Sequence, residues 1–262
     1  MFQSFPPLFS CNRSIDNSCQ IFKKNHYTSN GNQTIAFPVW ENLRISENHM
    51  NWLIGVFSSS IGKKQIMACT GLIFCLFLAT HLIGNLTIYG GNRMFNAYSE
   101  HLHAYGLIIN VIELALLFFV VLHISFATIL YFQNWRARPV RYKMKKNAGG
   151  RTLSSTLMPY TGLYLLVYVV LHLLTFHFVD RAGRTLYQLV ADVFSQPEYV
   201  IFYTFSMIVA ALHVKHGLWS AFQTIGADHP KYMPLIKGMS WIFSLLVGFG
   251  FGPIPLIMLA GV

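Results

Sequence analysis

Four histidines, each inside a long apolar segment, are the residues of this chain whose type and spacing could carry chemistry. They are His81, His123, His172 and His213, and they recur at intervals of 42, 49 and 41 residues. An imidazole in hydrocarbon is costly unless it has a partner, so ionisable residues inside apolar segments are candidates for a functional site. One histidine per segment suggests two facing pairs, and two facing imidazoles can hold a six-coordinate heme iron.

The elements that must position these histidines are expected to be membrane-spanning helices. The chain is 54% hydrophobic and only 11% charged, whereas soluble proteins carry about 25% charged residues. Its apolar blocks reach the roughly 20 residues that one helical crossing requires. We therefore expect an all-α, polytopic membrane protein, a bundle of five transmembrane helices that encloses two stacked hemes. The spans are placed at residues 66–89, 106–132, 158–179, 199–225 and 238–260.

The basic residues predict how the bundle is oriented. The net charge of +10 could indicate nucleic-acid binding, but the positions of the Lys and Arg residues beside the spans are better explained by topology, and no nucleic acid is expected. Cytoplasmic loops carry an excess of Lys and Arg. The side with three basic residues has Arg93, Arg181 and Arg184. The side with eleven has Lys63, Lys64, Arg136, Arg138, Arg141, Lys143, Lys145, Lys146, Arg151, Lys231 and Lys237. The richer side should be cytoplasmic, with the amino terminus inside and the carboxy terminus outside the cell inner membrane.

Depth decides how the four histidines pair. With a rise of about 1.5 Å per residue, His81 and His172 lie roughly 22 and 21 Å above the cytoplasmic starts of their spans. His123 and His213 lie roughly 25 and 21 Å below the outer starts of theirs. In a hydrocarbon core of about 30 Å, this predicts that His81 pairs with His172 and that His123 pairs with His213. Structural zinc is a poor alternative, because it needs four ligands at one point.

Two residues beside His213 are candidate heme-binding groups. His216 is three residues further on, on the same helix face, and about 4.5 Å nearer the cytoplasm. A heme propionate could accept a hydrogen bond from His216 or from Lys215. The alternative for Lys215 is that its side chain extends toward the inner surface of the membrane, and the sequence leaves both possibilities open.

Quinone chemistry would require a group that exchanges protons near the ring. Among the nine Asp and Glu residues, Glu113 is the one well inside an apolar run, between Ile108 and Val121. The alternative is a carboxyl that simply hydrogen-bonds a neighbouring helix. Glu100 is a second catalytic candidate at the outer mouth, although an ordinary solvated loop is the favoured interpretation there.

The two ends of the chain differ in character from its centre. Residues 1–49 are polar and Asn-rich, and we expect a disordered or spurious extension, with Met50 as a possible true start of a single membrane domain, 50–262. The fifth span contains Gly248, Gly250 and Gly252, followed by two prolines. These glycines permit close helix packing and the prolines a kink, so this span is expected to be structural or lipid-facing.

Several segments together resemble a known family. The stretch from Met50 to Lys64, MNWLIGVFSSSIGKK, is followed by THLIGNL at 80–86, FNAYSEHLH at 95–103, IEL at 112–114 and HVKHGLWS at 213–220. From residue 50 onward the chain is similar to the single-chain, five-helix cytochrome b subunits of succinate dehydrogenases and fumarate reductases. In that family one histidine from each of the first four helices ligates heme, and the match assigns this role on the fourth helix to His213.

The resemblance implies a function and a set of partners. The chain would be the membrane anchor of a succinate:quinone oxidoreductase, without the succinate site, and would carry electrons between that site and menaquinone. Flavoprotein and iron–sulfur subunits would dock on its cytoplasmic face. Two b-type hemes are expected, because no CxxCH motif for covalent attachment is present. The alternatives are a cytochrome b subunit of a formate dehydrogenase or hydrogenase, and a heme-free proton-coupled transporter with a histidine relay.

Overall fold

The structure, a computed structural model, describes residues 11–13, 19–21, 54–137 and 153–261. Contacts divide the chain into two units, residues 1–49 and 50–262. In the first unit, strands β1 (Cys11–Arg13) and β2 (Cys19–Ile21) pair antiparallel. Whether residues 1–49 belong to the working protein stays a prediction. Met50 and the basic loop 138–152, with Arg138, Arg141, Lys143, Lys145, Lys146 and Arg151, lie outside the described residues.

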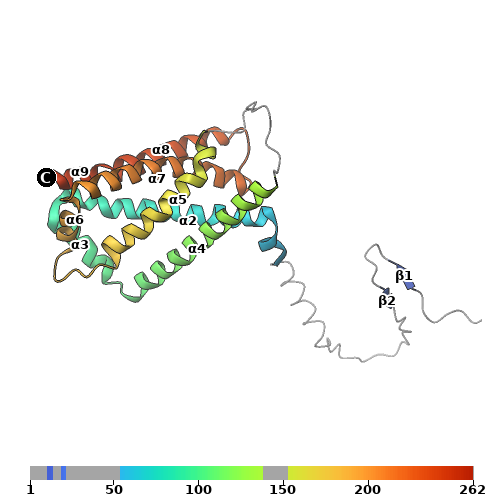
Figure 1. Cartoon of the computed structure of the whole chain (residues 1–262), viewed down its shortest axis with the longest axis horizontal. Coiled ribbons are helices and arrows are strands. Elements are labelled where there is room, and N and C mark those ends of the chain that lie inside the picture. Colours follow the sequence, from blue (N-terminus) through green and yellow to red (C-terminus); the bar gives the residue numbers. More distant parts are fainter. Residues whose placement is uncertain (1–10, 14–18, 22–53, 138–152, 262) are drawn as a thin grey trace, which may run out of the picture. The chain divides into compact units, whose positions relative to one another are not determined.

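The described part of the second unit is built from helices, in agreement with the expected all-α class (Figure 1). Five helical stretches are long and apolar enough to cross a membrane: 60–103, 107–136, 153–177, 197–224 and 233–259. A helix satisfies its own backbone hydrogen bonds, which hydrocarbon cannot do. The elements in chain order are α2 (Ser60–Leu86), η1 (Thr87–Gly90), α3 (Gly91–His103), α4 (Leu107–Arg136), α5 (Leu153–His172), η2 (Leu173–His177), α6 (Leu186–Phe194), α7 (Pro197–Thr224), α8 (Met233–Phe251) and α9 (Pro253–Leu259).

At the end with more basic residues, α2, α4, α5 and α8 extend four to six residues beyond the predicted spans, because hydropathy stops at polar residues and helices do not. Thus α2 begins at Ser60, where the Ser59 hydroxyl accepts a hydrogen bond from the Gly62 amide, a typical N-cap. The sequence did not predict the short helices α3 and α6. Helix α6 begins with a capping box, in which Thr185 and Gln188 each bond the other's backbone amide.

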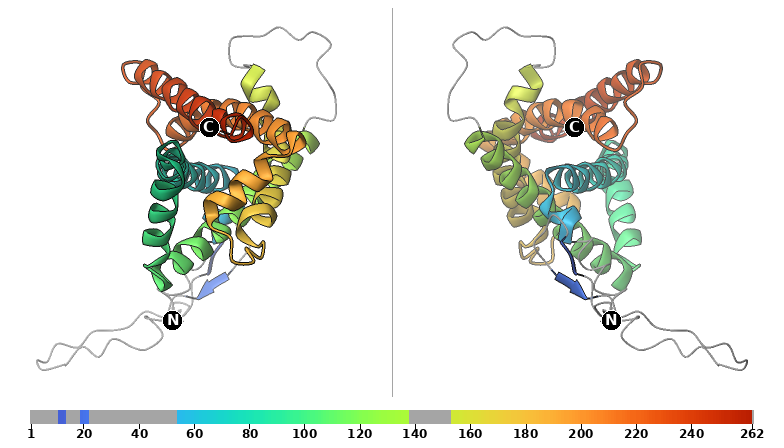
Figure 2. Two further views of the ribbon diagram at one scale, coloured as in Figure 1. Left: turned by 90° about the vertical axis from the view of Figure 1, so that its left-hand side faces the viewer. Right: turned by 90° about the vertical axis from the view of Figure 1, so that its right-hand side faces the viewer.

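Consecutive long helices run antiparallel, and this places most of the described Lys and Arg residues at one end of the bundle. Helix α2 packs against α4, α7 and α8, and α5 packs against α7. The start of α2, the end of α4 and the α7–α8 connection lie at one end of the bundle, while α3, α6 and α9 lie at the other (Figure 1). Helix α3 runs across that second end rather than along the bundle (Figure 2). Of the described basic residues used for topology, Lys63, Lys64, Arg136, Lys231 and Lys237 therefore share the first end.

The fifth span is attached to α7 by a row of small residues. On α8, Ser240 and Ser244 donate hydrogen bonds to the carbonyls of Lys215 and Ala211, the second at 2.7 Å. Four residues later, a Cβ added to Gly248 would lie 3.4 Å from the Cβ of Ala211. Small residues four apart let two helices approach closely, and hydroxyl groups add interhelical bonds. The expected close packing is confirmed, and the helix is interrupted at Gly252, between α8 and α9, directly before Pro253.

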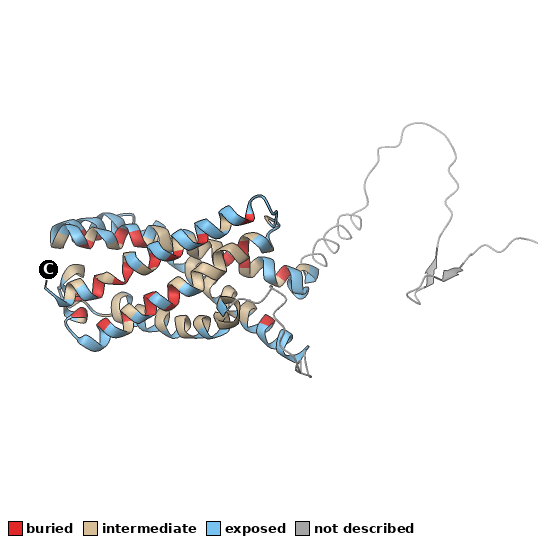
Figure 3. Cartoon of the chain, turned by 90° about the horizontal axis from the view of Figure 1, so that it is seen from above, coloured by how far each residue is buried: buried red, intermediate tan, exposed pale blue. Residues whose placement is uncertain are grey.

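The outward faces of the bundle are apolar. Buried residues are few and lie mainly where helices meet, whereas exposed residues cover the outer faces (Figure 3). Leu107, Leu163, Ile201 and Phe249 are among the exposed large apolar side chains. Helix α5 has no fully buried residue, and α4 has only Leu130. An apolar exterior of this extent fits a lipid environment better than water.

We predict that replacing Gly248 by Leu destabilises the bundle, because the larger side chain must separate α8 from Ala211 on α7. Overpacking of this kind costs about 1–3 kcal/mol. Thermal unfolding of the purified protein in detergent should show a lower midpoint for G248L. The matched control is F249L, at a neighbouring residue that is 74% exposed. Equal midpoints for G248L and the unmodified chain would contradict this packing.

Candidate functional site: two histidine pairs at two levels

The structure brings His81 of α2 and His172 of α5 together. Their ring centroids are 6.0 Å apart and their planes are nearly perpendicular, at 86°. Aromatic rings surround the pair. Phe77 stacks on His81 at 5.2 Å, and Tyr168 stacks on His172 at 5.7 Å. We call these two residues the outer pair, because their end of the bundle carries fewer of the basic residues.

The backbone changes directly after His172. Helix α5 ends there, and residues Leu173–His177 form a π-helical turn, in which the Phe178 amide donates to the Leu173 carbonyl. The sequence did not predict this wider turn. Single π turns inside helices are rare and frequent at functional sites. The Nδ1 atom of His172 is buried and has no hydrogen-bond partner among the described residues.

His123 of α4 and His213 of α7 each contact a Thr-Gly dipeptide on a neighbouring helix. The Nδ1 atom of His123 lies 2.9 Å from the Thr70 hydroxyl of α2. The Nδ1 atom of His213 lies 3.0 Å from the Thr161 hydroxyl of α5. The two histidines thus have matching surroundings. We call them the inner pair.

The two pairs lie at different depths along the bundle. On α2, Thr70 marks the level of the inner pair and His81 that of the outer pair, and the two residues are 11 positions apart. On α5, Thr161 and His172 have the same separation. At about 1.5 Å per residue, both helices place the levels about 16 Å apart. The contact between His81 and His172 agrees with the pairing expected from depth, and the pairing of His123 with His213 stays a prediction.

The two candidates beside His213 differ in their surroundings. Lys215 lies on the face of α7 toward α8, with its Nζ atom 3.3 Å from the centre of the Trp241 ring. This is a cation–π contact, and both roles expected for Lys215 stay predictions. His216 lies 5.0 Å from the Trp219 ring and interacts electrostatically with His213. Its buried Nδ1 atom has no partner among the described residues, so His216 remains the better candidate to bind a ligand group.

Glu113 is exposed on α4 and makes no hydrogen bond or ion pair within residues 54–137 and 153–261. The alternative of a carboxyl bonded to a neighbouring helix is therefore wrong for the described residues. Glu113 precedes His123 by ten positions, so it lies about 15 Å closer to the outer end. This is close to the level of the outer pair.

Glu100 lies on helix α3, not in the solvated loop favoured from the sequence. It borders a polar cleft of about 260 Å³, formed by α3 and the segment before α6. Arg181 and Arg184 contribute to the same cleft, and Arg184 forms an ion pair with Asp192 at 2.9 Å. His101 and His103, on the same helix as Glu100, are exposed.

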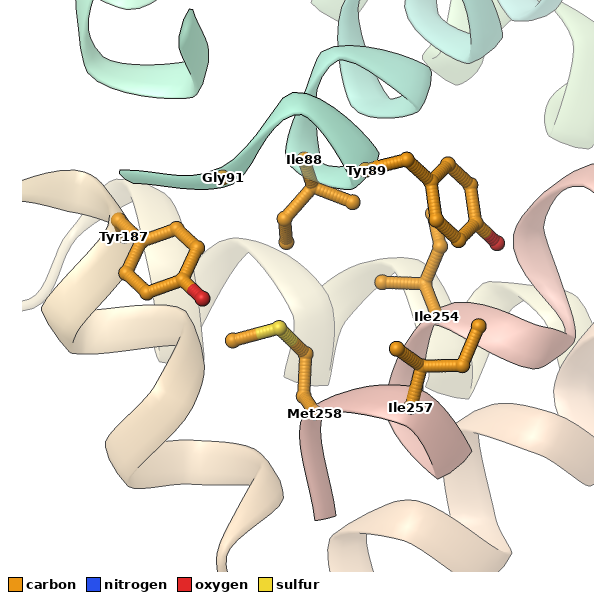
Figure 4. Close-up of a pocket in the computed structure, with 7 residues that line it drawn as sticks. All are labelled: Ile88, Tyr89, Gly91, Tyr187, Ile254, Ile257 and Met258. Atoms are coloured by element: carbon orange, nitrogen blue, oxygen red, sulfur yellow. The ribbon is translucent and has the colours of Figure 1, made fainter. Parts of the chain in front are cut away.

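A small apolar cavity lies at the same end of the bundle (Figure 4). Its volume is about 100 Å³, well below the roughly 300–1,000 Å³ typical of ligand sites. Two tyrosines provide its polar atoms. The cavity is lined by Ile88, Tyr89, Gly91, Tyr187, Ile254, Ile257 and Met258. Its size and lining do not indicate a binding site.

Comparisons with known proteins give no further support for any family. No family model, no curated protein and no solved structure matches this chain. Among the described residues, no three His, Cys, Asp or Glu side chains converge as a metal site. A bis-histidine iron site needs only two protein ligands, so the two pairs are the features that carry the functional argument.

Proposed function

We propose that this chain is the diheme cytochrome b subunit that anchors a succinate dehydrogenase or fumarate reductase in the cell inner membrane. The observation that carries the proposal is the presence of two histidine pairs at two levels about 16 Å apart. The identity of the complex is proposed from the family resemblance. The arrangement of the histidines supports only the proposal that the chain binds heme. In this role the chain does not bind succinate.

The outer pair fits a bis-histidine iron site. Metal–nitrogen bonds to imidazole are about 2 Å long, so two imidazoles on opposite sides of one ion have ring centroids roughly 6 Å apart. The centroids of His81 and His172 are 6.0 Å apart. The buried, unpartnered Nδ1 of His172 also leaves this ring without a role in helix–helix hydrogen bonding among the described residues.

The inner pair fits the same chemistry through its hydrogen bonds. Each ring uses Nδ1 to contact a threonine, which leaves Nε2 as the nitrogen available to a metal. Ligating histidines commonly hold their other ring nitrogen in such a bond. Bound at the two levels, b-type hemes would supply one-electron carriers without an open iron position. The protein's own task is to hold the four imidazoles and exclude water.

Menaquinone is the proposed membrane substrate, and Glu113 the proposed proton-exchanging residue. Reduction of a quinone consumes protons as well as electrons, so a proton carrier must lie near the ring. Glu113 is near the outer level and exposed on α4. Glu100, beside the polar cleft at the same end, is the second candidate. A carboxyl at either position would exchange protons between the quinone and the outer surface of the membrane.

The partners are proposed to dock at the basic end. Flavoprotein and iron–sulfur subunits would face the end that carries Lys63, Lys64, Arg136, Lys231 and Lys237. Cytoplasmic ends of membrane proteins are enriched in such residues. Electrons would then pass between the docked subunits and the inner pair, and between the outer pair and menaquinone.

A proton-coupled transporter is less consistent with the described helices. Transporters commonly bind substrate near the midplane, at helices broken there. Here α2, α4 and α7 continue past both levels without a break. The irregular positions η1, η2 and the α8–α9 junction lie at the outer end, and Pro159 lies near the inner end of α5. No described feature favours a substrate site at the midplane.

We predict two b-type hemes per chain, and loss of the outer heme alone in H172A. A pyridine hemochrome assay with the purified complex measures the heme count, and absorption spectra distinguish the two components. The control is H177A, an exposed histidine five residues later, which should keep both. One heme or none in the unmodified chain would contradict the proposal, as would equal loss of both components in an H172A complex that still assembles.

We predict that Glu113→Gln abolishes most quinone-linked turnover, because Gln keeps the size of the side chain but cannot carry the ionisable proton. Loss of an acid–base group typically costs at least about 100-fold. Succinate oxidation with a soluble dye acceptor, and both hemes, should be unchanged. The control is Glu198→Gln, in the exposed first turn of α7. Normal menaquinone turnover in E113Q would shift the role to Glu100.

A further inference from the structure

Each inner histidine contacts a Thr-Gly dipeptide of a neighbouring helix, which we call its cradle. The two cradles make the same contacts, although one belongs to α2 and the other to α5. Thr161 and Gly162 follow Thr70 and Gly71 by 91 residues, as His172 follows His81. A Cβ added to Gly71 would lie 3.4 Å from Cε1 of His123, and one added to Gly162 would lie 3.5 Å from Cε1 of His213. The sequence pattern Thr-Gly-x9-His therefore occurs twice and builds the same contact twice.

The hydrogen bonds decide which ring nitrogen carries the proton on His123. The Thr70 hydroxyl has one hydrogen, and its oxygen lies 2.9 Å from the Ile66 carbonyl and 3.0 Å from that of Met67. With that hydrogen directed to the helix, the hydroxyl oxygen must accept from Nδ1–H of His123. The Met67 carbonyl also interacts with His123, and a carbonyl can only accept.

The same reasoning applies to His213. The Thr161 hydroxyl lies 3.1 Å from the carbonyls of Leu157 and Met158, and it is 3.0 Å from Nδ1 of His213. In both cradles the arrangement that satisfies every group has the proton on Nδ1. The Nε2 lone pair is then free to bind a metal.

The outer pair has no equivalent bond. Nδ1 of His172 is buried without a partner, and no hydrogen bond of the His81 ring exists among the described residues. A hydrogen bond from Nδ1–H makes an imidazole a stronger donor to a metal. Stronger donation favours the ferric state and lowers the reduction potential of a heme. The two levels therefore differ in a property that affects electron transfer.

We propose that Thr70 and Thr161 are positioning residues that fix the tautomer and orientation of His123 and His213 toward the inner heme and lower its potential. Gly71 and Gly162 complete each cradle, because they lie against the ring edge, where an added Cβ would already be in van der Waals contact with Cε1. This inference rests on the proposed heme function. It adds that the inner and outer sites are tuned differently by the protein.

The test replaces each threonine by Val, which keeps the shape and removes the hydroxyl, and by Ser, which keeps the hydroxyl. Optical redox titration of the purified complex should show a more positive potential for the inner heme in T70V and T161V, and a larger shift in the double variant. The outer heme should be unchanged. Transfer of heme to apomyoglobin should be about 10- to 100-fold faster for the Val variants. T70S and T161S should resemble the unmodified chain.

The matched control is Thr224→Val. The Thr224 hydroxyl makes the same kind of bond to its own helix, to the Ser220 carbonyl at 2.8 Å, and contacts no histidine. Two hemes with unchanged potentials in T70V and T161V would overturn the role of the threonines and leave the proposed function intact. Equal shifts of both hemes, a shift in T224V, or heme loss in both the Val and the Ser variants would also overturn it. An unmodified chain without heme would refute the proposed function and this inference together.

Discussion

The placement of imidazoles in hydrocarbon is the constraint on which the rest of this structure depends. A polar ring at this depth is costly unless it forms a bond, because lipid offers no hydrogen-bond partner. The inner pair meets the requirement through Thr70 and Thr161. In the outer pair, the rings of His81 and His172 contact each other and neighbouring aromatic rings. The buried Nδ1 of His172 has no hydrogen-bond partner among the described residues. The helices around these rings place two of the four imidazoles at the outer level and two at the inner level.

Because the long helices are regular, the number of residues between two positions gives their difference in depth along the bundle. Helices α2, α4 and α7 have 27, 30 and 28 residues, and a regular rise per residue makes counting along them a measurement of height. This explains why the pairing of His81 with His172 could be predicted from the sequence. The π turn η2 follows His172, the α8–α9 junction lies at the outer end, and Pro159 precedes Thr161 in α5, so none of them falls between the two levels on α2 or α5.

The sequence could not predict the features that depend on side-chain contacts or on short amphipathic segments. Hydropathy identifies long apolar runs, and it therefore missed α3 and α6. The π turn after His172 has no residue signature comparable to a proline or glycine. The dipeptide Thr70-Gly71 is unremarkable until α4 places His123 beside it. Its repetition at 161–162, the same distance before a histidine, was a signal that a search for internal repeats could have detected. The contact of Lys215 with Trp241 required the face of α7 that packs on α8.

The repeated cradles divide the bundle into two equivalent helix pairs. Helices α2 and α4 share one Thr–His contact, and α5 and α7 share the other. The histidines proposed to share a heme, however, come from different pairs: His81 of α2 faces His172 of α5, and His123 of α4 is expected to pair with His213 of α7. Hemes bound as proposed would therefore each join one helix of the first pair to one of the second. Because α4 and α5 bury almost no residues against other helices, these two ligand bridges would hold the halves together where side-chain packing is thinnest.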